Sequence, residues 1–460
     1  MFKRLLLAIA VWLSATGAMA ALNAAVVWEV QTGGNDLNGG GFKTGATGTD
    51  YSIIAGPRVT IDGTTITCTV NATTTKLDIA GYTCGAGDVG NIAQLSINGG
   101  ALAFFEITAV TGTTQWTVDR AAGTAAQTGT GRMGGCLASL GRLNAGPTTG
   151  NRVYVKAGTY TMTTTTPGAA GPIVMATTGY VIEGYNSSRG DLGTAPVISA
   201  GSQTGIIMFT SGICWSQQTI NNITLDGNNG STNNGFLAYN KRHTFYKCTA
   251  QNFSNSTTTY GFSQASQYIN CRAIACGIGF VVNDYGGHYY GCWASECTGN
   301  GFRQSGESNS NSAWINCISS NNTGSANGFS IIGNQQMIIG CIAFGNADDG
   351  FDFAAVDNLV TNCIAFDNGG YGYNTSTDNC LALLNCASYD NTSGRVKAAA
   401  LLDKDAILLS TDPFVNSATG DFRLNNTAGG GAACIAAGIG VYGQTGPAHV
   451  GAVAPSIDYP

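Results

Sequence analysis

The sequence predicts an all-β protein whose main part is a right-handed parallel β-helix. Between residues 223 and 391 one phrase recurs, in which two apolar residues are followed by a small or polar residue and then cysteine. A Gly-aromatic pair recurs between these cysteines, as in Gly301-Phe302 and Gly350-Phe351. The cysteines are 23, 21, 25, 24, 22 and 23 residues apart: Cys248, Cys271, Cys292, Cys317, Cys341, Cys363 and Cys386. A repeat of this length indicates a solenoid.

Each repeat contains two or three short apolar runs separated by Asn, Gly, Ser and Asp. The runs are too short for helices and are rich in Ile, Val, Phe and Tyr, so they predict strands. Asn and Gly suit corners that need a positive φ. Three strands in a coil of about 22–24 residues define the parallel β-helix, with coils about 4.8 Å apart.

The repeated cysteines could form disulfides, bind a metal or only pack. Stacked at strand spacing, their Cβ atoms lie farther apart than the roughly 3.8 Å that a disulfide prefers. Because free Cys behaves as a small buried hydrophobe, we expect a reduced interior ladder. Cys276 and Cys297 each follow a ladder cysteine by five residues and predict a second short stack. Cys68 and Cys84 lie outside the repeat and are the candidates for a disulfide.

The composition agrees with stacked strands and tight corners. Of 460 residues, 66 are glycine, 10% are charged and 43% are hydrophobic, which argues against disorder. The net charge of −6 argues against a nucleic-acid partner. Residues 1–20 have the pattern of a signal peptide, with Lys3 and Arg4 before a short apolar core and an Ala-Met-Ala cleavage box. We therefore expect export, to the cell surface, the medium or the periplasm, and no membrane span.

The chain divides into six predicted segments. After the signal peptide, residues 21–42 form an entry strand and loop, and residues 43–133 form a small all-β insertion domain with a hairpin at 101–118. Residues 134–149 contain a capping helix, expected over 135–144, which would cover the open apolar end of the solenoid. The β-helix occupies residues 150–409, and residues 410–460 form a C-terminal cap and tail.

Both ends of the solenoid resemble those of secreted bacterial parallel β-helix proteins. The entry loop Gly34-Asn35-Asp36 and the first coil around Gly158-Thr159-Tyr160 are similar to the phrases that open these proteins. The pair of phrases at 411–415 and 420–424, Thr-Asp-Pro-Phe-Val and Gly-Asp-Phe-Arg-Leu, resembles their C-terminal cap. The resemblance covers residues 24–42 and most of 135–460.

One coil differs from the others because it is rich in carboxylates. It contains Asp348-Asp349-Gly350-Phe351-Asp352, and oxygen-rich clusters suit Ca²⁺. The alternative is a solvated corner whose Asp side chains cap backbone N–H groups. The phrase resembles the calcium-binding coil of family 9 pectate lyases, which are parallel β-helices. The resemblance implies that Asp348, Asp349 and Asp352 hold a Ca²⁺ that bridges protein and uronate, while a lysine on the neighbouring coil removes the C5 proton.

The sequence departs from that family at two points. The family's remaining Asp ligand falls near Asn321, Asn322 or Ser325, where this chain has no Asp. The family's lysine falls at Asn374, which cannot accept a proton at neutral pH.

Two other residues could take part in the chemistry. Arg303 lies two coils before the aspartates and suits a uronate carboxylate better than the role of a base, because its guanidinium stays protonated. Lys397, one coil after Asn374, is the other candidate base. Asn374 and Tyr373 are further candidates for contact with a sugar.

Three functions are compatible with these observations. The first is an exported, calcium-dependent polysaccharide lyase that cleaves an acidic, uronate-containing glycan by β-elimination. The second is a non-catalytic β-helix that binds glycans or cell surfaces, as adhesins and phage tailspike-like proteins do. The third is a purely structural extracellular role.

Overall fold

The computed structural model describes residues 22, 25–145, 151–166, 171–175, 181–211, 218–230, 233–238, 243–253, 258–264, 267–282, 287–304, 312–354, 357–375, 381–397, 401–435, 437–438 and 450–451. The predicted signal peptide lies outside these ranges. The chain forms two compact units, one of residues 1–156 with 179–182, and one of residues 157–178 with 183–460. In the described ranges no helix has the length and apolar character needed to cross a membrane.

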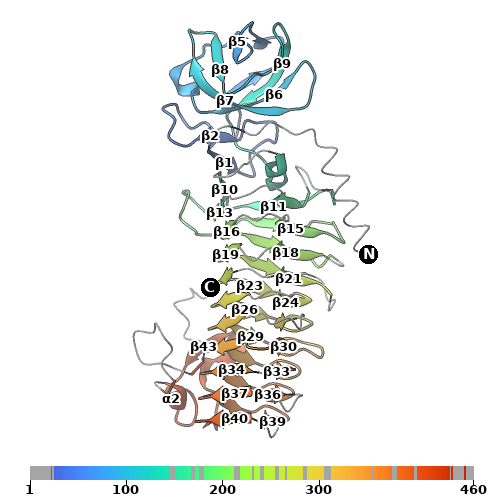
Figure 1. Cartoon of the computed structure of the whole chain (residues 1–460), viewed down its shortest axis with the longest axis vertical. Helices are drawn as coiled ribbons and strands as arrows, with labels where there is room; N and C mark the ends of the chain where they lie inside the picture. The colour runs from blue at the N-terminus through green and yellow to red at the C-terminus, as the bar shows by residue number, and fades with distance from the viewer. Residues whose placement is uncertain are drawn as a thin grey trace. The chain divides into compact units, whose positions relative to one another are not determined.

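The second unit is a parallel β-solenoid of three sheets, as the sequence predicted (Figure 1). Successive strands of the chain enter the three sheets in turn, and each strand pairs in parallel with the strand one coil away, as β19 does with β22. The first sheet has the order β13 (Val181–Tyr185, shared with the other unit), β16 (Thr219–Asn221), β19 (Thr244–Tyr246), β22 (Gln267–Ile269), β25 (His288–Tyr290), β28 (Ala313–Ile315), β31 (Met337–Ile339), β34 (Asn358–Thr361), β37 (Leu381–Leu384) and β40 (Leu401–Lys404).

The other two sheets complete each coil. The second sheet has the order β11 (Thr159–Thr161), β14 (Val197–Ser199), β17 (Thr224–Asp226), β20 (Thr249–Gln251), β23 (Arg272–Ile274), β26 (Trp293–Ser295), β29 (Ile318–Ser320), β32 (Ile342–Phe344), β35 (Ile364–Phe366), β38 (Ala387–Tyr389) and β41 (Ile407–Leu408). The third sheet has the order β12 (Ile173–Met175), β15 (Ile207–Ser211), β18 (Asn234–Ala238), β21 (Tyr260–Ser263), β24 (Ile278–Val282), β27 (Phe302–Gln304), β30 (Phe329–Ile331), β33 (Phe351–Phe353), β36 (Tyr371–Thr375) and β39 (Gly394–Val396).

The repeated phrases produce ladders inside the solenoid. The aromatic residues of the Gly-aromatic pairs stack ring on ring, with centroids 4.8 Å apart for Phe302 and Phe329 and for Phe329 and Phe351. All seven ladder cysteines are fully buried free thiols, so the predicted reduced ladder is confirmed. Each ladder thiol donates to a backbone carbonyl of the preceding coil, as Cys271 does to Phe245 O at 3.4 Å. Cys276 is likewise a buried free thiol, as is Cys297.

The residue before each ladder cysteine turns the corner between the first and second sheets. It adopts a left-handed conformation, with φ of 52° at Asn270, 59° at Gly291 and 53° at Asn316. Asn and Gly reach this region most readily, which explains why they recur there. A further interior ladder was not foreseen: the buried amides of Asn322, Asn346, Asn368 and Asn391 are joined by hydrogen bonds of 2.7 to 2.9 Å.

The C-terminal segment lies along the side of the solenoid. The hairpin of β42 (Phe414–Asn416) and β43 (Asp421–Leu424), joined by η3 (Ser417–Thr419), packs on the outward side of the second sheet, and α2 (Gly431–Cys434) follows. Phe422 contacts Phe344 with ring centroids 5.5 Å apart. The outward positions of β32 and β35 are apolar and need a cover, whereas Leu408 in the last coil stays exposed. The hairpin and α2, which belong to the segment predicted as a cap, therefore cover a lateral face.

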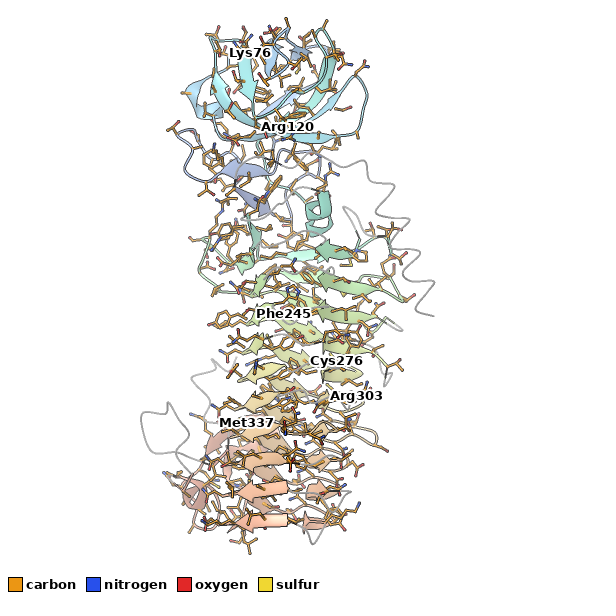
Figure 2. The ribbon with its side chains drawn as sticks, in the orientation of Figure 1. Lys76, Arg120, Phe245, Cys276, Arg303 and Met337 are labelled. Carbon is orange, nitrogen blue, oxygen red and sulfur yellow. The ribbon has the colours of Figure 1, made fainter. Side chains whose placement is uncertain are left out.

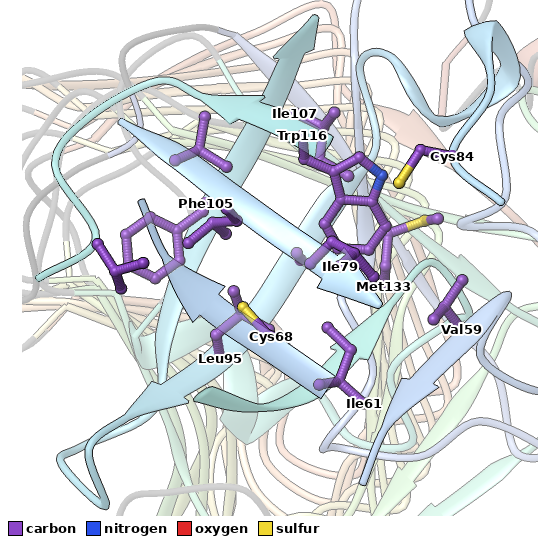
Figure 3. Close-up of a cluster of buried hydrophobic side chains, with 14 residues drawn as sticks. Val59, Ile61, Cys68, Ile79, Cys84, Leu95, Phe105, Ile107, Trp116 and Met133 are labelled. Atoms are coloured by element: carbon purple, nitrogen blue, oxygen red, sulfur yellow. The ribbon is translucent and has the colours of Figure 1, made fainter. Parts of the chain in front are cut away.

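The first unit contains a seven-stranded antiparallel sheet. Its order is β3 (Val59–Ile61), β9 (Thr128–Met133), β4 (Thr67–Val70), β5 (Lys76–Ala80), β8 (Gln115–Val118), β7 (Ala103–Val110) and β6 (Ile92–Ile97), with η1 (Ala86–Asp88) between β5 and β6. Because β6 also pairs with β9, six of the strands close into a barrel around a buried apolar cluster (Figure 3). Cys68 and Cys84 are separate free thiols in that cluster, so the suggested disulfide is not formed.

The predicted capping helix is wrong in its bounds and type. Strand β1 (Val26–Val30) pairs with β2 (Gly41–Lys43) and β10 (Arg152–Lys156), and Leu137 forms a parallel bridge with Val30. The N–H of Leu137 donates to Glu29 O, and Leu137 O accepts from the N–H of Gln31, so the backbone at Leu137 is extended rather than helical. Helical structure is therefore limited to the 3₁₀ helix η2 (Leu140–Ala145).

Candidate functional site

The third sheet carries one row of outward side chains across five consecutive strands. The strand register aligns Arg303 with Ser330, Ser330 with Asp352, and Asp352 with Asn374. Tyr373 pairs with Val396 on the next strand, so the residue after Val396 continues the same row. We call this set the outward row: Arg303, Ser330, Asp352, Asn374 and Lys397. Asp352 points outward because it alternates with Phe351 and Phe353, which are buried.

The corner before β33 places two more carboxylates beside the row. Asp349 is 6% exposed, and its Oδ1 accepts a hydrogen bond from the backbone N–H of Tyr371 at 2.6 Å. Its Oδ2 accepts from Asn374 Nδ2, also at 2.6 Å. Asn327 occupies the same position one coil earlier, where its Oδ1 accepts from the N–H of Asp349. Asp349 is therefore one step of an outer ladder in which each side chain accepts the N–H of the next coil.

Asp352 lies between two amide donors. Its Oδ2 accepts from Asn327 Nδ2 at 3.1 Å and its Oδ1 from Asn374 Nδ2 at 3.2 Å. Burial, followed by the charges of Asp349 and Asp348, raises the pKa of Asp352 to about 6, while Lys397 opposes the shift. Burial and the charge of Asp349 also raise the pKa of Asp348. The three carboxylates thus carry more negative charge than the described surroundings neutralise.

Two observations fit a cation near these carboxylates. The Oδ1 atom of Asn374 is buried without a hydrogen-bond partner, and Asn374 is 8% exposed. Gly370 forms a tight cradle for two carboxylate oxygens, because a Cβ there would lie 2.3 Å from Asp349 Oδ1 and 2.9 Å from Asp348 Oδ1. Carboxylate and amide oxygens are the donors that Ca²⁺ takes. Among the described residues, however, no three Asp, Glu, His or Cys side chains already surround one point, since Asp349 is turned toward Tyr371 and Asn374.

The structure relocates some of the residues named from the sequence. Tyr373 cannot contact a ligand, because it is fully buried and its hydroxyl donates to Cys363 O and Ala387 O inside the solenoid. Asn322, considered as the position of the missing ligand, belongs to the interior amide ladder. The side chain that faces Asp352 from the preceding coil is Asn327, which sequence reasoning missed. Asn327 comes directly before Gly328-Phe329, one of the repeated Gly-aromatic pairs, and this position in the repeat could have identified it.

The two candidate bases each lie two strands from Asp352 in the outward row, but they differ in their interaction with the acids. Lys397 is exposed, its Nζ lies 5.9 Å from the centroid of the Tyr371 ring, and it interacts electrostatically with both Asp348 and Asp352. Arg303 lies two strands before Asp352 in the outward row and on the opposite side from Lys397. Lys397 is therefore the cationic side chain that the outward row brings to the carboxylates.

Comparison with known proteins gives matches among solved structures. No family model and no curated sequence matches the chain. The pectate lyase Pel9A is 18% identical, covers 66% of this chain and 88% of its own, and has a TM-score of 0.42. The A-module of the Azotobacter vinelandii mannuronan C-5 epimerase AlgE6 is 14% identical, with coverages of 60% and 75% and a TM-score of 0.29.

A rhamnogalacturonan lyase also matches. It is 12% identical, covers 59% of this chain and 80% of its own, and has a TM-score of 0.27. A pectate lyase and a rhamnogalacturonan lyase are thus among the matched solved structures.

Proposed function

We propose that this chain is an exported protein that binds an acidic polysaccharide along the outward row and cleaves it by calcium-dependent β-elimination. The observation that carries the proposal is the register of the third sheet, which aligns Arg303, Asp352 and Lys397 on one face. Asp348 and Asp349 lie at the corner beside that face. Uronate polymers carry a carboxylate on each unit, so a face that alternates cations with a metal-binding acid cluster matches their charge.

The residues that would hold Ca²⁺ are Asp348, Asp349 and Asp352, with Asn374 Oδ1 as a further oxygen. The unpartnered amide oxygen, the cradle at Gly370 and the raised pKa of Asp352 support this assignment. When bound, Ca²⁺ would draw electron density from the uronate carboxyl group and so acidify the proton at C5. Asn327 and Asn374 hold the Asp352 carboxylate in place through their amide N–H groups.

Lys397 is the side chain suited to accept the proton. A neutral amine is a base, whereas the guanidinium of Arg303 and the amide of Asn374 are not. In the proposed step the Lys397 amine takes the C5 proton, and the electron pair of the broken C–H bond forms a double bond between C4 and C5. The C4–O bond breaks and the leaving oxygen takes a proton from water. The hydroxide that remains takes the proton from the Lys397 ammonium group, so the neutral amine is restored and atoms and charge balance.

A non-catalytic, glycan-binding function is the second candidate. Asn374 occupies the position next to Asp352, and its amide donates to both Asp349 and Asp352. The position closest to the acids therefore serves to hold carboxylates rather than to move a proton. Under this alternative the row binds the same acidic polymer without turnover.

The test is turnover of polygalacturonate with Ca²⁺, followed by the ultraviolet absorbance of the 4,5-unsaturated product. Lys397→Ala should abolish turnover but retain polymer binding, and the matched control Lys404→Ala, on the first sheet, should behave as wild type. Asp348→Asn combined with Asp352→Asn, or removal of Ca²⁺ by chelation, should abolish turnover and weaken binding. Binding without turnover by the wild type would favour the second candidate. Absence of binding to every uronate polymer tried would reject both.

A further inference from the structure

Arg303 is a cation that has no acidic partner among the residues that the structure describes. It lies on β27, where it is in register with Val281 on one neighbouring strand and with Ser330 on the other. Its side chain is half-buried, and its Nε is buried without a hydrogen-bond partner. Figure 2 labels Arg303 on the side of the solenoid that the third sheet forms. No ion pair joins Arg303 to any residue that the structure describes.

Two other half-buried arginines of the solenoid, Arg395 and Arg272, have different surroundings. Arg395 forms an ion pair with Asp403, and that contact raises its pKa against the effect of burial. Arg272 lies over the ring of Trp293, with its guanidinium carbon 5.3 Å from the centroid. At Arg303 burial alone lowers the pKa, and no acidic group opposes it. A partly desolvated guanidinium whose Nε has no hydrogen-bond partner is less favourable than one that an anion neutralises.

The spacing between Arg303 and Asp352 determines which unit of a bound glycan would lie at Arg303. Two strand steps separate it from Asp352, which corresponds to about 10 Å along the solenoid axis. Ser330 is the intervening member of the outward row, and the amide of Asn327 faces Asp352 from the same coil. That span is about two pyranose units of an extended glycan.

We propose that Arg303 forms a separate subsite that binds the carboxylate of a uronate two units away from the unit held at Asp352. The guanidinium presents a planar pair of donors that matches a carboxylate, whereas a lysine would present a point charge. This inference rests on the proposed function, because it places one polymer chain on both sites. It makes Arg303 a specificity-determining residue that distinguishes charged from esterified or neutral glycans and sets a minimum chain length of three units.

The test measures oligogalacturonate binding by calorimetry, with Ca²⁺ and separately with chelator. With Ca²⁺, Arg303→Gln should weaken binding of the trimer and longer oligomers by roughly ten-fold or more, which is the usual effect of losing a hydrogen bond to a charged group. It should leave binding of the monomer and of methyl-esterified oligomers unchanged. Arg303→Lys should be intermediate because it keeps the charge and loses the fork. Arg423→Gln, an exposed arginine on β43, is the matched control and should have no effect.

The two hypotheses fail in different ways. If the wild type binds or cleaves the polymer with Ca²⁺ and Arg303→Gln binds the trimer equally well, the Arg303 subsite is rejected and the proposed function stands. If Ca²⁺ has no influence but chelator-treated protein binds oligogalacturonate in a manner that Arg303→Gln abolishes, the Arg303 subsite stands and the calcium-dependent function is rejected. Circular dichroism of each variant, matching that of the wild type, confirms that the fold is retained.

Discussion

The stacked aromatic residues and the outward row lie on opposite faces of the third sheet, yet they differ in regularity. Inside the third sheet the residues at one position are Phe280, Phe302, Phe329, Phe351 and Tyr373. One residue further along, the outward row changes from Arg303 to Ser330, Asp352, Asn374 and Lys397. Each interior residue packs on the equivalent residues of the two neighbouring coils, so the same residue type fits at this position in every coil. The outward face has no such requirement, so its residues can differ from coil to coil.

The largest expected effect comes from the interior. Phe329→Ala should lower the free energy of unfolding by about 3–5 kcal/mol, because it leaves a cavity between two stacked rings. Ser330→Ala, the next residue and outward-facing, removes a single oxygen and should change it by about 1 kcal/mol or less. Urea unfolding followed by circular dichroism measures both. Equal losses from the two substitutions would contradict the division between the faces.

A buried imidazole gives the interior a pH dependence. Burial lowers the pKa of His243 to about 4, and the side chain is 1% exposed. Its folded-state pKa is therefore below the unfolded value of about 6.5, so the stability it contributes is complete above pH 6.5 and is lost as the pH falls toward 4. The loss amounts to about 3 kcal/mol.

This pH dependence can be measured by comparing wild type with His243→Gln in urea unfolding between pH 7 and pH 4. The substitution should flatten the decline by about that amount, and taking the difference between the two proteins removes the titration of Asp352 in the same range. Parallel curves would show that His243 does not titrate as expected.

The outward carboxylates should behave in the opposite sense. The pKa of Asp352 is raised to about 6, above its unfolded value, so its ionisation destabilises the fold as the pH rises from about 4 to 6. Without metal at pH 7, Asp352→Asn should raise the free energy of unfolding by about 1 kcal/mol, after allowance for solvent screening and for one amide donor that loses its acceptor.

Two further measurements complete this comparison. Asp405→Asn, at an exposed position, should have no measurable effect on the free energy of unfolding. Added Ca²⁺ should stabilise wild type and not Asp352→Asn, because binding to the folded state alone raises its stability. A wild-type protein whose melting temperature is the same in Ca²⁺ and in chelator would argue against a metal at this corner.

Much of the fold was predictable because the solenoid is built from local repeats. The cysteine and Gly-aromatic phrases predicted the coil length, the reduced ladder and the alignment of Arg303 with Asp352 and Asn374. The capping helix was not predicted correctly, because Leu137 pairs with a strand more than a hundred residues earlier in the chain. The lateral position of the C-terminal hairpin also depends on distant contacts, although the apolar outward residues of β32 and β35 carried a signal for it.

The candidate site divides in the same way. The sequence by itself determined which side chains occupy the outward row, because strand spacing and alternation are properties of the repeat. Only the tertiary structure decided what those side chains do there. Asp349 and Asn374 are joined by a hydrogen bond, and Tyr373 is enclosed. Lys397 interacts with the acids, while Arg303 has no ion-pair partner among the described residues. The physical reason is that backbone register follows from local periodicity, whereas hydrogen-bond partners and burial depend on neighbouring coils that more than twenty residues of chain separate.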